Sequence, residues 1–94
     1  MLNEDVVFSE CMGGISNAIA DFDALCAIAF RKRGYDPIAI SNYGNDCWVQ
    51  CSTLLALLYK LKLIDIKEYS EDLEGITKSI TDIKENWRDK KYGR

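Results

Sequence analysis

The sequence predicts an all-α protein with three principal helices, and room for a short fourth, in a small antiparallel bundle. Its final third carries apolar residues at helical spacing. No strict apolar–polar alternation longer than four residues lies between turn signals, as a strand would require. Only one of the 94 residues is proline. Because a chain of this length supplies one hydrophobic core, we interpret residues 1–94 as a single domain.

The first principal helix is predicted over residues 15–33. Apolar residues recur there every three or four positions, and Gly34 follows as a typical C-terminal signal. Residues 1–14 continue the same helical phase, but Gly13 and Gly14 stand together, and each lowers helix stability by about 1 kcal/mol relative to alanine. We therefore expect residues 1–14 to form a separate arm or a kinked start of the helix.

The segment after Gly34 carries its own helix signals. Asp36 is a favourable N-cap residue, and Pro37 suits the first position of a helix because its fixed φ is already helical. We expect residues 37–43 to form one short helical turn that Gly44 ends. This turn is the short fourth helix of the prediction, and it connects two antiparallel helices.

The second principal helix is predicted over residues 46–63, with Asn45 or Asp46 as its N-cap. Its apolar residues occupy more than one face, which is typical of a central helix or of one buried in an oligomer. Two neighbouring helices cannot cover that much apolar surface in so short a chain. We therefore predict a homodimer or a higher oligomer.

The third principal helix is predicted over residues 66–91. Its apolar residues alternate at spacings of three and four, the pattern of a coiled-coil core or an oligomer seam. The seam residues are Ile66, Tyr69, Leu73, Ile76, Ile80, Ile83 and Trp87. Gly75 interrupts this helix beside the seam, where a missing side chain lets another backbone approach. We interpret it as a contact site or a kink.

The charge balance restricts the partners and the compartment. Twelve basic residues against 15 acidic residues give a net charge of −3 and a pI near 4.8, so binding to nucleic acid or to anionic lipid is not expected. The first ten residues are acidic at Glu4, Asp5 and Glu10, where a signal peptide would be basic. No window holds the roughly 18 uncharged apolar residues of a membrane span. We expect a cytoplasmic protein with no membrane segment.

Four cysteines, Cys11, Cys26, Cys47 and Cys51, stand inside apolar helical patterns. In a secreted protein they would suggest two disulfides, but this pattern favours free thiols that pack as small apolar side chains. Cys47 and Cys51 are one helical turn apart, so two thiolates could reach one metal ion, with the other two cysteines completing its shell. Because histidine and the CxxC spacing are absent, we predict no metal and no cofactor.

No catalytic constellation is present. The chain contains no histidine, the commonest general base, and no cysteine has an adjacent base that would activate it. All-α nucleotide pyrophosphohydrolases hold Mg²⁺ between acidic pairs on facing helices, and the acidic residues here do not form two such pairs. We therefore predict a protein that is not an enzyme, and keep the metal-dependent pyrophosphohydrolase as a second alternative.

The main functional hypothesis is a small acidic helical protein that regulates or inhibits a macromolecular partner by surface contact. Proteins of this size and charge are common among phage and mobile-element inhibitors and among antitoxins, which is a match of size class only. Acidic faces could occupy a basic groove of a protein partner that normally binds nucleic acid. The candidate partner-binding residues are Glu68, Glu71, Asp72, Glu74, Asp21 and Asp23.

The first alternative is a helical oligomer that sequesters a small anionic, phosphate-bearing ligand between its subunits. Basic, aromatic and amide groups gather around the predicted connection after residue 33, and this mixture suits such a ligand. The candidate ligand-binding residues are Arg31, Lys32, Arg33, Tyr35, Asn42 and Tyr43.

Overall fold

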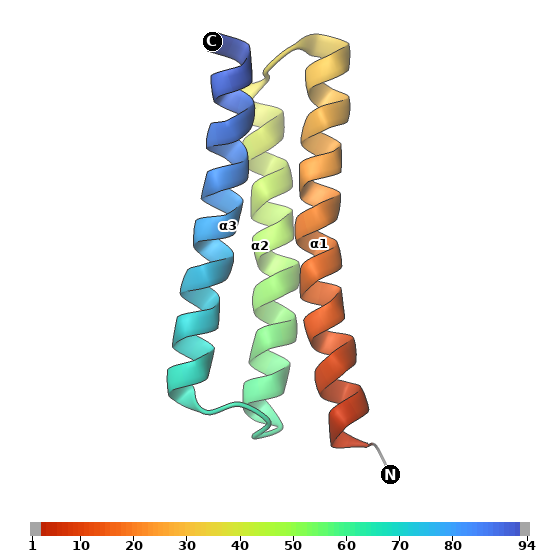
Figure 1. The fold of residues 1–94 in the computed structure, drawn as a ribbon, viewed down its shortest axis with the longest axis vertical. Helices are drawn as coiled ribbons and strands as arrows, with labels where there is room; N and C mark the ends of the chain where they lie inside the picture. Colours follow the sequence, from red (N-terminus) through yellow and green to blue (C-terminus); the bar gives the residue numbers. More distant parts are fainter. Residues whose placement is uncertain (1–2, 93–94) are drawn as a thin grey trace.

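The computed structural model describes residues 3–92, apart from the side chain of Arg33, and within that range contains three α-helices and no strand. The helices are α1 (Glu4–Arg33), α2 (Pro37–Lys60) and α3 (Ile66–Tyr92), packed into an elongated bundle of 49 × 24 × 18 Å. The end of α1, the start of α2 and the end of α3 lie at the same end of the molecule (Figure 1). The all-α helical bundle is confirmed.

Helix α1 runs without a break from Glu4 to Arg33, so a separate arm before Ile15 is wrong for the described residues, and residues 1–2 of the predicted arm lie outside them. The Asn3 side chain caps the helix by accepting from the backbone N–H of Asp5 at 2.8 Å. The two adjacent glycines remain helical because α1 packs against α2 at this level: a Cβ on Gly14 would lie 2.8 Å from Leu54 Cδ1. Close packing between the helices outweighs the low helix propensity of glycine.

The end of α1 follows the expected pattern. Gly34 has a positive φ of 76°, and its backbone N–H donates to the carbonyl oxygen of Phe30 at 2.8 Å. Glycine adopts this backbone conformation without the steric cost that a side chain would bring. The chain can therefore leave α1 sharply and begin α2 three residues later.

Helix α2 begins where Asp36 and Pro37 predict a helix start. Asp36 Oδ1 accepts from the backbone N–H of Ile38 at 3.1 Å and of Ala39 at 3.3 Å, and Pro37 is the first helical residue. The separate short helix over 37–43 and the second start at Asn45 or Asp46 are wrong, because the helix continues without a break to Lys60.

Gly44 explains the wrong boundary within α2. It is buried inside the helix, and a Cβ at this position would lie 2.6 Å from Lys84 Cε and 3.4 Å from Ile80 Cγ2 of α3. Gly44 therefore permits close helix packing and does not end a helix. At its other end α2 stops at Lys60, three residues before the predicted residue 63, because the chain turns through Lys62, whose φ is 64°.

Helix α3 has nearly the predicted bounds. Its start is closed by a reciprocal pair of hydrogen bonds: Glu68 N–H donates to Asp65 Oδ1 at 2.8 Å, and Asp65 N–H donates to Glu68 Oε1 at 3.2 Å. Of the predicted seam, Ile76 and Ile80 are buried. Tyr69, Leu73, Ile83 and Trp87 are half-buried against the core.

Ile66 is the predicted seam residue that lies outside the core of the single chain, since 61% of its surface is exposed. It stands in the first turn of α3, close to the connection from α2. Ile64, in that connection, is 5% exposed and belongs to the core cluster at this end. The heptad pattern therefore begins one turn before the buried contacts of α3.

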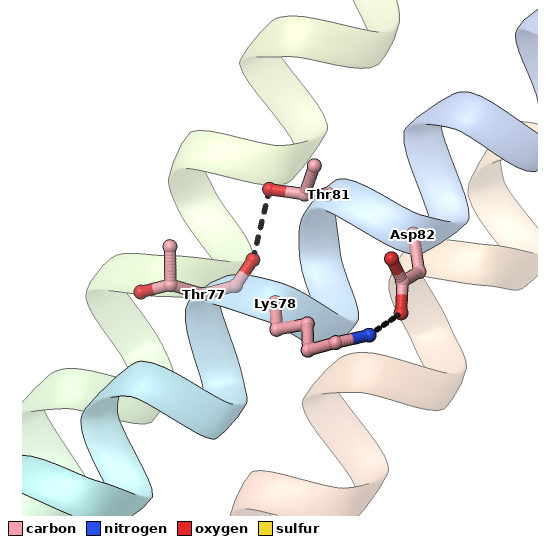
Figure 2. A network of polar contacts seen from close by, with 4 residues as sticks. All are labelled: Thr77, Lys78, Thr81 and Asp82. Carbon is pink, nitrogen blue, oxygen red and sulfur yellow. Dashed lines mark hydrogen bonds and ion pairs between the residues drawn. The ribbon is translucent and has the colours of Figure 1, made fainter.

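Four polar residues of α3 interact within their own helix (Figure 2). Lys78 Nζ pairs with Asp82 Oδ2 at 2.9 Å, and the Thr81 hydroxyl donates to the carbonyl oxygen of Thr77 at 3.0 Å. The hydrogen bond that Lys78 donates to Asp82 raises the pKa of Lys78. These contacts join residues four apart, so they stabilise the helix rather than its packing.

The core lies mainly between α1 and α2, where the cysteines are found. All four are free and buried. The Cys47 thiol donates to the carbonyl oxygen of Ala18 at 3.4 Å, and the Cys51 thiol to that of Ile15 at 3.7 Å. Thiols therefore fill the α1–α2 contact as small core side chains.

One 29-residue part of α1, Glu4–Lys32, is long and apolar enough to cross a membrane by length and composition alone. Of its most apolar 18-residue window, 28% is buried inside the bundle. A packed core helix of a soluble protein passes the same test. This finding leaves the location of the protein open.

Candidate functional site: a groove between the first and third helices

Helices α1 and α3 are joined at one end by Trp87. The indole Nε1 donates to Asp23 Oδ1 at 2.7 Å, and the indole centroid lies 5.3 Å from that of Phe30. Of the three helix pairs, α1 and α3 nevertheless share the fewest contacts. Both helices pack mainly on α2, so towards the other end of the bundle α1 and α3 do not close on one another.

A groove of about 270 Å³ lies between the two helices towards that end. All three helices contribute to its lining. The residues are Met12, Ile15 and Ile19 of α1, Leu55 of α2, and Glu71, Asp72, Gly75, Ile76 and Ser79 of α3. We call this surface the α1–α3 groove. Its floor is apolar, and its polar groups stand along α3.

The polar side of the α1–α3 groove is negatively charged. Glu71 is exposed and Asp72 is half-buried. The ion pairs found among the described residues are Lys78–Asp82 and Arg88–Asp89, so neither groove carboxylate forms a direct ion pair within the described chain. An apolar surface flanked by free carboxylates can bind a group that is apolar on one side and cationic on the other.

Gly75 contributes open space to this groove. An added Cβ would meet nothing within 4 Å, and α3 continues through this position as a single helix. Gly75 therefore does not end or interrupt the helix, and no contact within the described chain uses the missing side chain. The space over Gly75 is available to a molecule that enters the groove.

The six acidic candidates for partner binding occupy different places. Glu71 and Asp72 line the α1–α3 groove. Glu68 accepts a hydrogen bond in the cap of α3, and Glu74 is exposed outside the groove lining. Asp23 is bonded to Trp87.

The sixth acidic candidate, Asp21, lines a separate hollow of about 200 Å³ between α1 and α2, where Tyr43 and Asp46 also lie. The structure therefore brings two of the six acidic candidates together in one groove. The other four are dispersed over a cap, an exposed face, a tryptophan contact and this second hollow.

The candidates for anionic-ligand binding are not brought into one site. Arg31, Lys32 and Asn42 are exposed, and Tyr35 packs its ring 5.9 Å from that of Tyr92. The side chain of Arg33 lies outside the described part of the structure.

Tyr43 is separated from the basic residues of this set. It shares the second hollow with two carboxylates, which repel an anion. Leu25 also lines this hollow, and it precedes Arg31 by six residues, or about 9 Å along the helix. The hollow that Tyr43 lines therefore contains neither Arg31 nor Lys32.

A larger hollow of about 660 Å³ follows the connection between α2 and α3. It carries lysines, Lys60 and Lys62, together with Asp65 and Glu68, so it has no consistent charge. Its two carboxyl groups already accept the capping hydrogen bonds of α3. We therefore interpret this hollow as a consequence of the turn.

Three of the cysteines, Cys26, Cys47 and Cys51, are poorly suited to act as nucleophiles. Burial raises the pKa of Cys26 to about 11 and that of Cys47 to about 12, and it also raises the pKa of Cys51. At neutral pH these thiols are protonated and weakly nucleophilic. Within residues 3–92, no group of three or more His, Cys, Asp or Glu side chains is arranged to hold a metal ion.

The sequence identified the acidic residues of the groove but missed the groove itself. Ile15 and Ile19 belong to the apolar pattern that predicts the first helix, and nothing in that pattern shows that α1 and α3 leave a gap beside them. Gly75 was the available signal, since a glycine beside an apolar seam permits close approach. No protein-family model, no curated protein and no solved structure matches this chain.

Proposed function

We propose that this protein is a small acidic helical interaction protein that regulates or inhibits a macromolecular partner by surface contact, with the α1–α3 groove as its binding surface. The observation that carries the proposal is the apolar floor of the groove beside two carboxylates, Glu71 and Asp72, that lack a cation within the described chain. Four free buried thiols are consistent with action in the cytoplasm, where thiols remain reduced.

The two parts of the groove have different roles in binding. Burial of the apolar floor supplies free energy at about 25 cal/mol per Å² of surface removed from water. The carboxylates orient a basic partner and speed its association, and they disfavour acidic partners. A partner held through its basic surface is no longer free to bind other anionic molecules there, which gives a direct route to inhibition.

A matched pair of charge reversals tests this proposal. Glu71→Lys changes the groove, whereas Glu74→Lys changes the net charge equally on the same helix but outside the groove lining. In capture experiments with the tagged protein, we expect Glu71→Lys to lose its partner and Glu74→Lys to retain it. Circular dichroism should show unchanged helicity in both. Equal capture by the two variants, or equal loss, would contradict the proposal.

We also infer that the antiparallel bundle self-associates through exposed apolar residues that lie outside the α1–α3 groove. Ile38 is 75% exposed and Val49 is 56% exposed, both on α2, and neither lines the α1–α3 groove. Burying them between copies would remove apolar surface from water. Light scattering should give a mass that is a multiple of 10.7 kDa, unchanged by reductant or chelator. A monomer would contradict this inference.

A further inference from the structure

We propose that the occupant of the α1–α3 groove is an amphipathic α-helix of a partner protein, apolar on one side and carrying lysine or arginine along the side that faces α3. This proposal rests on the proposed function and names the chemistry of the partner. In this mode of recognition, the apolar face of a helix lies in an apolar groove and is anchored by residues at i, i+3 or i+4, and i+7.

The shape of the groove favours a helix over a small molecule. The groove of about 270 Å³ is a shallow surface between two helices rather than an enclosed cavity. Met12, Ile15 and Ile19 follow one another along α1 at spacings of three and four, so they form an apolar line about 10 Å long, parallel to the helix. Phe8, 39% exposed, precedes Met12 by one turn. A fourth helix lying along this line would complete a four-helix bundle.

Gly75 provides the close approach that helix packing requires. Two helices pack about 8–10 Å apart depending on the side chains at their contact, and a glycine allows the shorter distance. An added Cβ at Gly75 meets nothing within 4 Å, although glycine costs an exposed helix about 1 kcal/mol relative to alanine. No neighbour within the described chain uses this space, so the helix of a partner can pack over it.

Charge selects the kind of helix. Glu71 and Asp72 stand on the α3 side of the apolar line, without a cation from the described chain. A helix with lysines or arginines along that side gains two charge pairs, whereas an acidic helix meets two like charges. Each exposed pair contributes about 0.2–1 kcal/mol, so the two together discriminate by about tenfold in affinity.

A second copy of this chain does not supply the required helix from its own basic segment. Arg88, Lys90 and Lys91 lie near the end of α3, but the apolar residue among them is Trp87. That side chain already packs on Phe30 and donates to Asp23, and Lys90 Nζ lies 4.3 Å from the indole centroid. If this segment entered the groove of another copy, Trp87 would lose its contacts with Phe30 and Asp23 of its own chain. The basic segment of α3 is therefore not the occupant, and the proposed occupant is a helix of a different protein.

The probe for this proposal is a synthetic helical peptide of about 18 residues, or five turns, with leucine at i, i+3 or i+4, and i+7, and with lysine along one flank. A second peptide keeps the leucines and replaces each lysine by glutamate. We expect the lysine peptide to bind about tenfold more tightly in fluorescence anisotropy. In NMR spectra of the ¹⁵N-labelled full chain, it should shift the amide signals of Met12, Ile15, Gly75 and Ser79.

A matched pair of glycine substitutions distinguishes binding of the peptide in the groove from nonspecific binding. Gly75→Met fills the groove, and Gly13→Met places the same side chain at an open helical glycine outside the groove lining. Both variants should fold, since methionine has the higher helix propensity and neither Cβ meets a neighbour. We expect Gly75→Met to weaken binding of the lysine peptide at least about tenfold, and Gly13→Met to leave it unchanged.

Each contrary result has a definite meaning. Equal affinity for the two peptides, NMR shifts outside the groove, or unchanged binding by Gly75→Met would overturn the helix as occupant. A dimer that becomes monomeric in Gly75→Met would also overturn it, because a second copy would then fill the groove. If peptide binding fails while Glu71→Lys still abolishes partner capture, the proposed function stands without the helix. If the peptide binds the groove but Glu71→Lys leaves capture intact, the proposed function is wrong and the helix site stands.

Discussion

At the scale of single residues, the glycines of this chain have three different physical roles. Gly34 ends a helix with a positive φ that side chains rarely adopt. Gly14 and Gly44 lie against side chains of a neighbouring helix, so they permit close packing. Gly13 and Gly75 have open space where a Cβ would stand. The same residue type therefore predicts opposite effects of substitution at different positions.

A comparison of Gly34→Ala with Gly13→Ala tests this assignment. At Gly34 the backbone, with φ 76° and ψ −164°, is strained for any side chain, so alanine should lower stability by about 1–3 kcal/mol. At Gly13 nothing lies within 4 Å of an added Cβ, so alanine should raise stability by up to about 1 kcal/mol. In thermal denaturation, each kcal/mol corresponds to about 4–8 °C in Tm. Shifts in the same direction would contradict the assignment.

The buried thiols predict a loss of stability in alkali. An unperturbed cysteine thiol has a pKa of 9.0, and burial raises the pKa to about 11 at Cys26 and about 12 at Cys47. Well below pH 9 both thiols are protonated in the folded and unfolded states, so they contribute no pH dependence. Above pH 9 the unfolded chain releases these protons first, and stability falls by about 1.4 kcal/mol per pH unit for each thiol until its folded-state pKa is reached.

Urea denaturation between pH 8 and pH 10.5 measures this effect. Cys26→Ala should reduce the slope of stability against pH, even though the variant is less stable at neutral pH because it leaves a small cavity. The slope is thus the readout that a merely structural role would not change. An identical slope in Cys26→Ala and in the unmodified protein would show that other groups cause the pH dependence.

At the scale of helices, the sequence predicts a helix end correctly where the residues at that end determine it. Asp36 and Pro37 fix the start of α2, Gly34 fixes the end of α1, and α3 has nearly its predicted bounds. The wrong boundaries fall at Gly13–Gly14 and at Gly44. A glycine lowers helix propensity and also permits a close contact, and the sequence does not show which effect applies because it does not show the neighbouring helix.

The candidate site was less accessible than the helices. The acidic side chains Glu71 and Asp72 and the unusual Gly75 were visible in the sequence. The groove arises because α1 and α3 both pack on α2 and only weakly on one another. That arrangement depends on helix packing angles and on contacts distant in sequence, such as Trp87 with Asp23. Neither the packing angles nor these contacts can be predicted from the spacing of apolar residues within one helix.

The Asp36 cap gives a prediction at the scale of a helix. Its carboxylate accepts from two backbone N–H groups at the start of α2. Asp36→Ala should therefore lower the free energy of unfolding by about 1 kcal/mol, as measured by urea denaturation. Asp36→Asn is the matched control, because asparagine caps a helix about as well and should retain most of the stability. Equal losses in the two variants would assign the effect to charge instead of capping.

At the scale of the whole molecule, the bundle is unevenly held together. Helices α1 and α2 share the most contacts, including the buried thiols, whereas α3 contacts α1 least. Away from the Trp87 end, contacts with α2 such as Tyr59–Tyr69 and Trp48–Thr77 help to hold α3. Regions with fewer buried contacts open more readily than the rest of a fold. Helix α3, in which Ile76 and Ile80 are the buried residues of the described part, is such a region compared with α2.

Hydrogen exchange should reveal this unevenness. We expect backbone amides of α3 near Gly75 to exchange faster than those near Cys51 at the centre of α2, because opening there breaks fewer buried contacts. Addition of the lysine peptide should slow exchange near Gly75 and leave the amides near Cys51 nearly unchanged. Uniform protection across the three helices of the free protein would mean that the bundle opens only as one unit.

The bond between Asp23 and Trp87 also has a consequence for folding kinetics. It joins residues 64 positions apart, whereas the other helix contacts of the bundle are mostly between helices adjacent in sequence. Contacts between adjacent helices close shorter loops and form early, and a contact that closes a longer loop forms late. Weakening a late contact leaves the folding rate nearly unchanged and accelerates unfolding. The lifetime of the folded molecule is therefore set in part by one indole hydrogen bond at the end of the bundle remote from the groove.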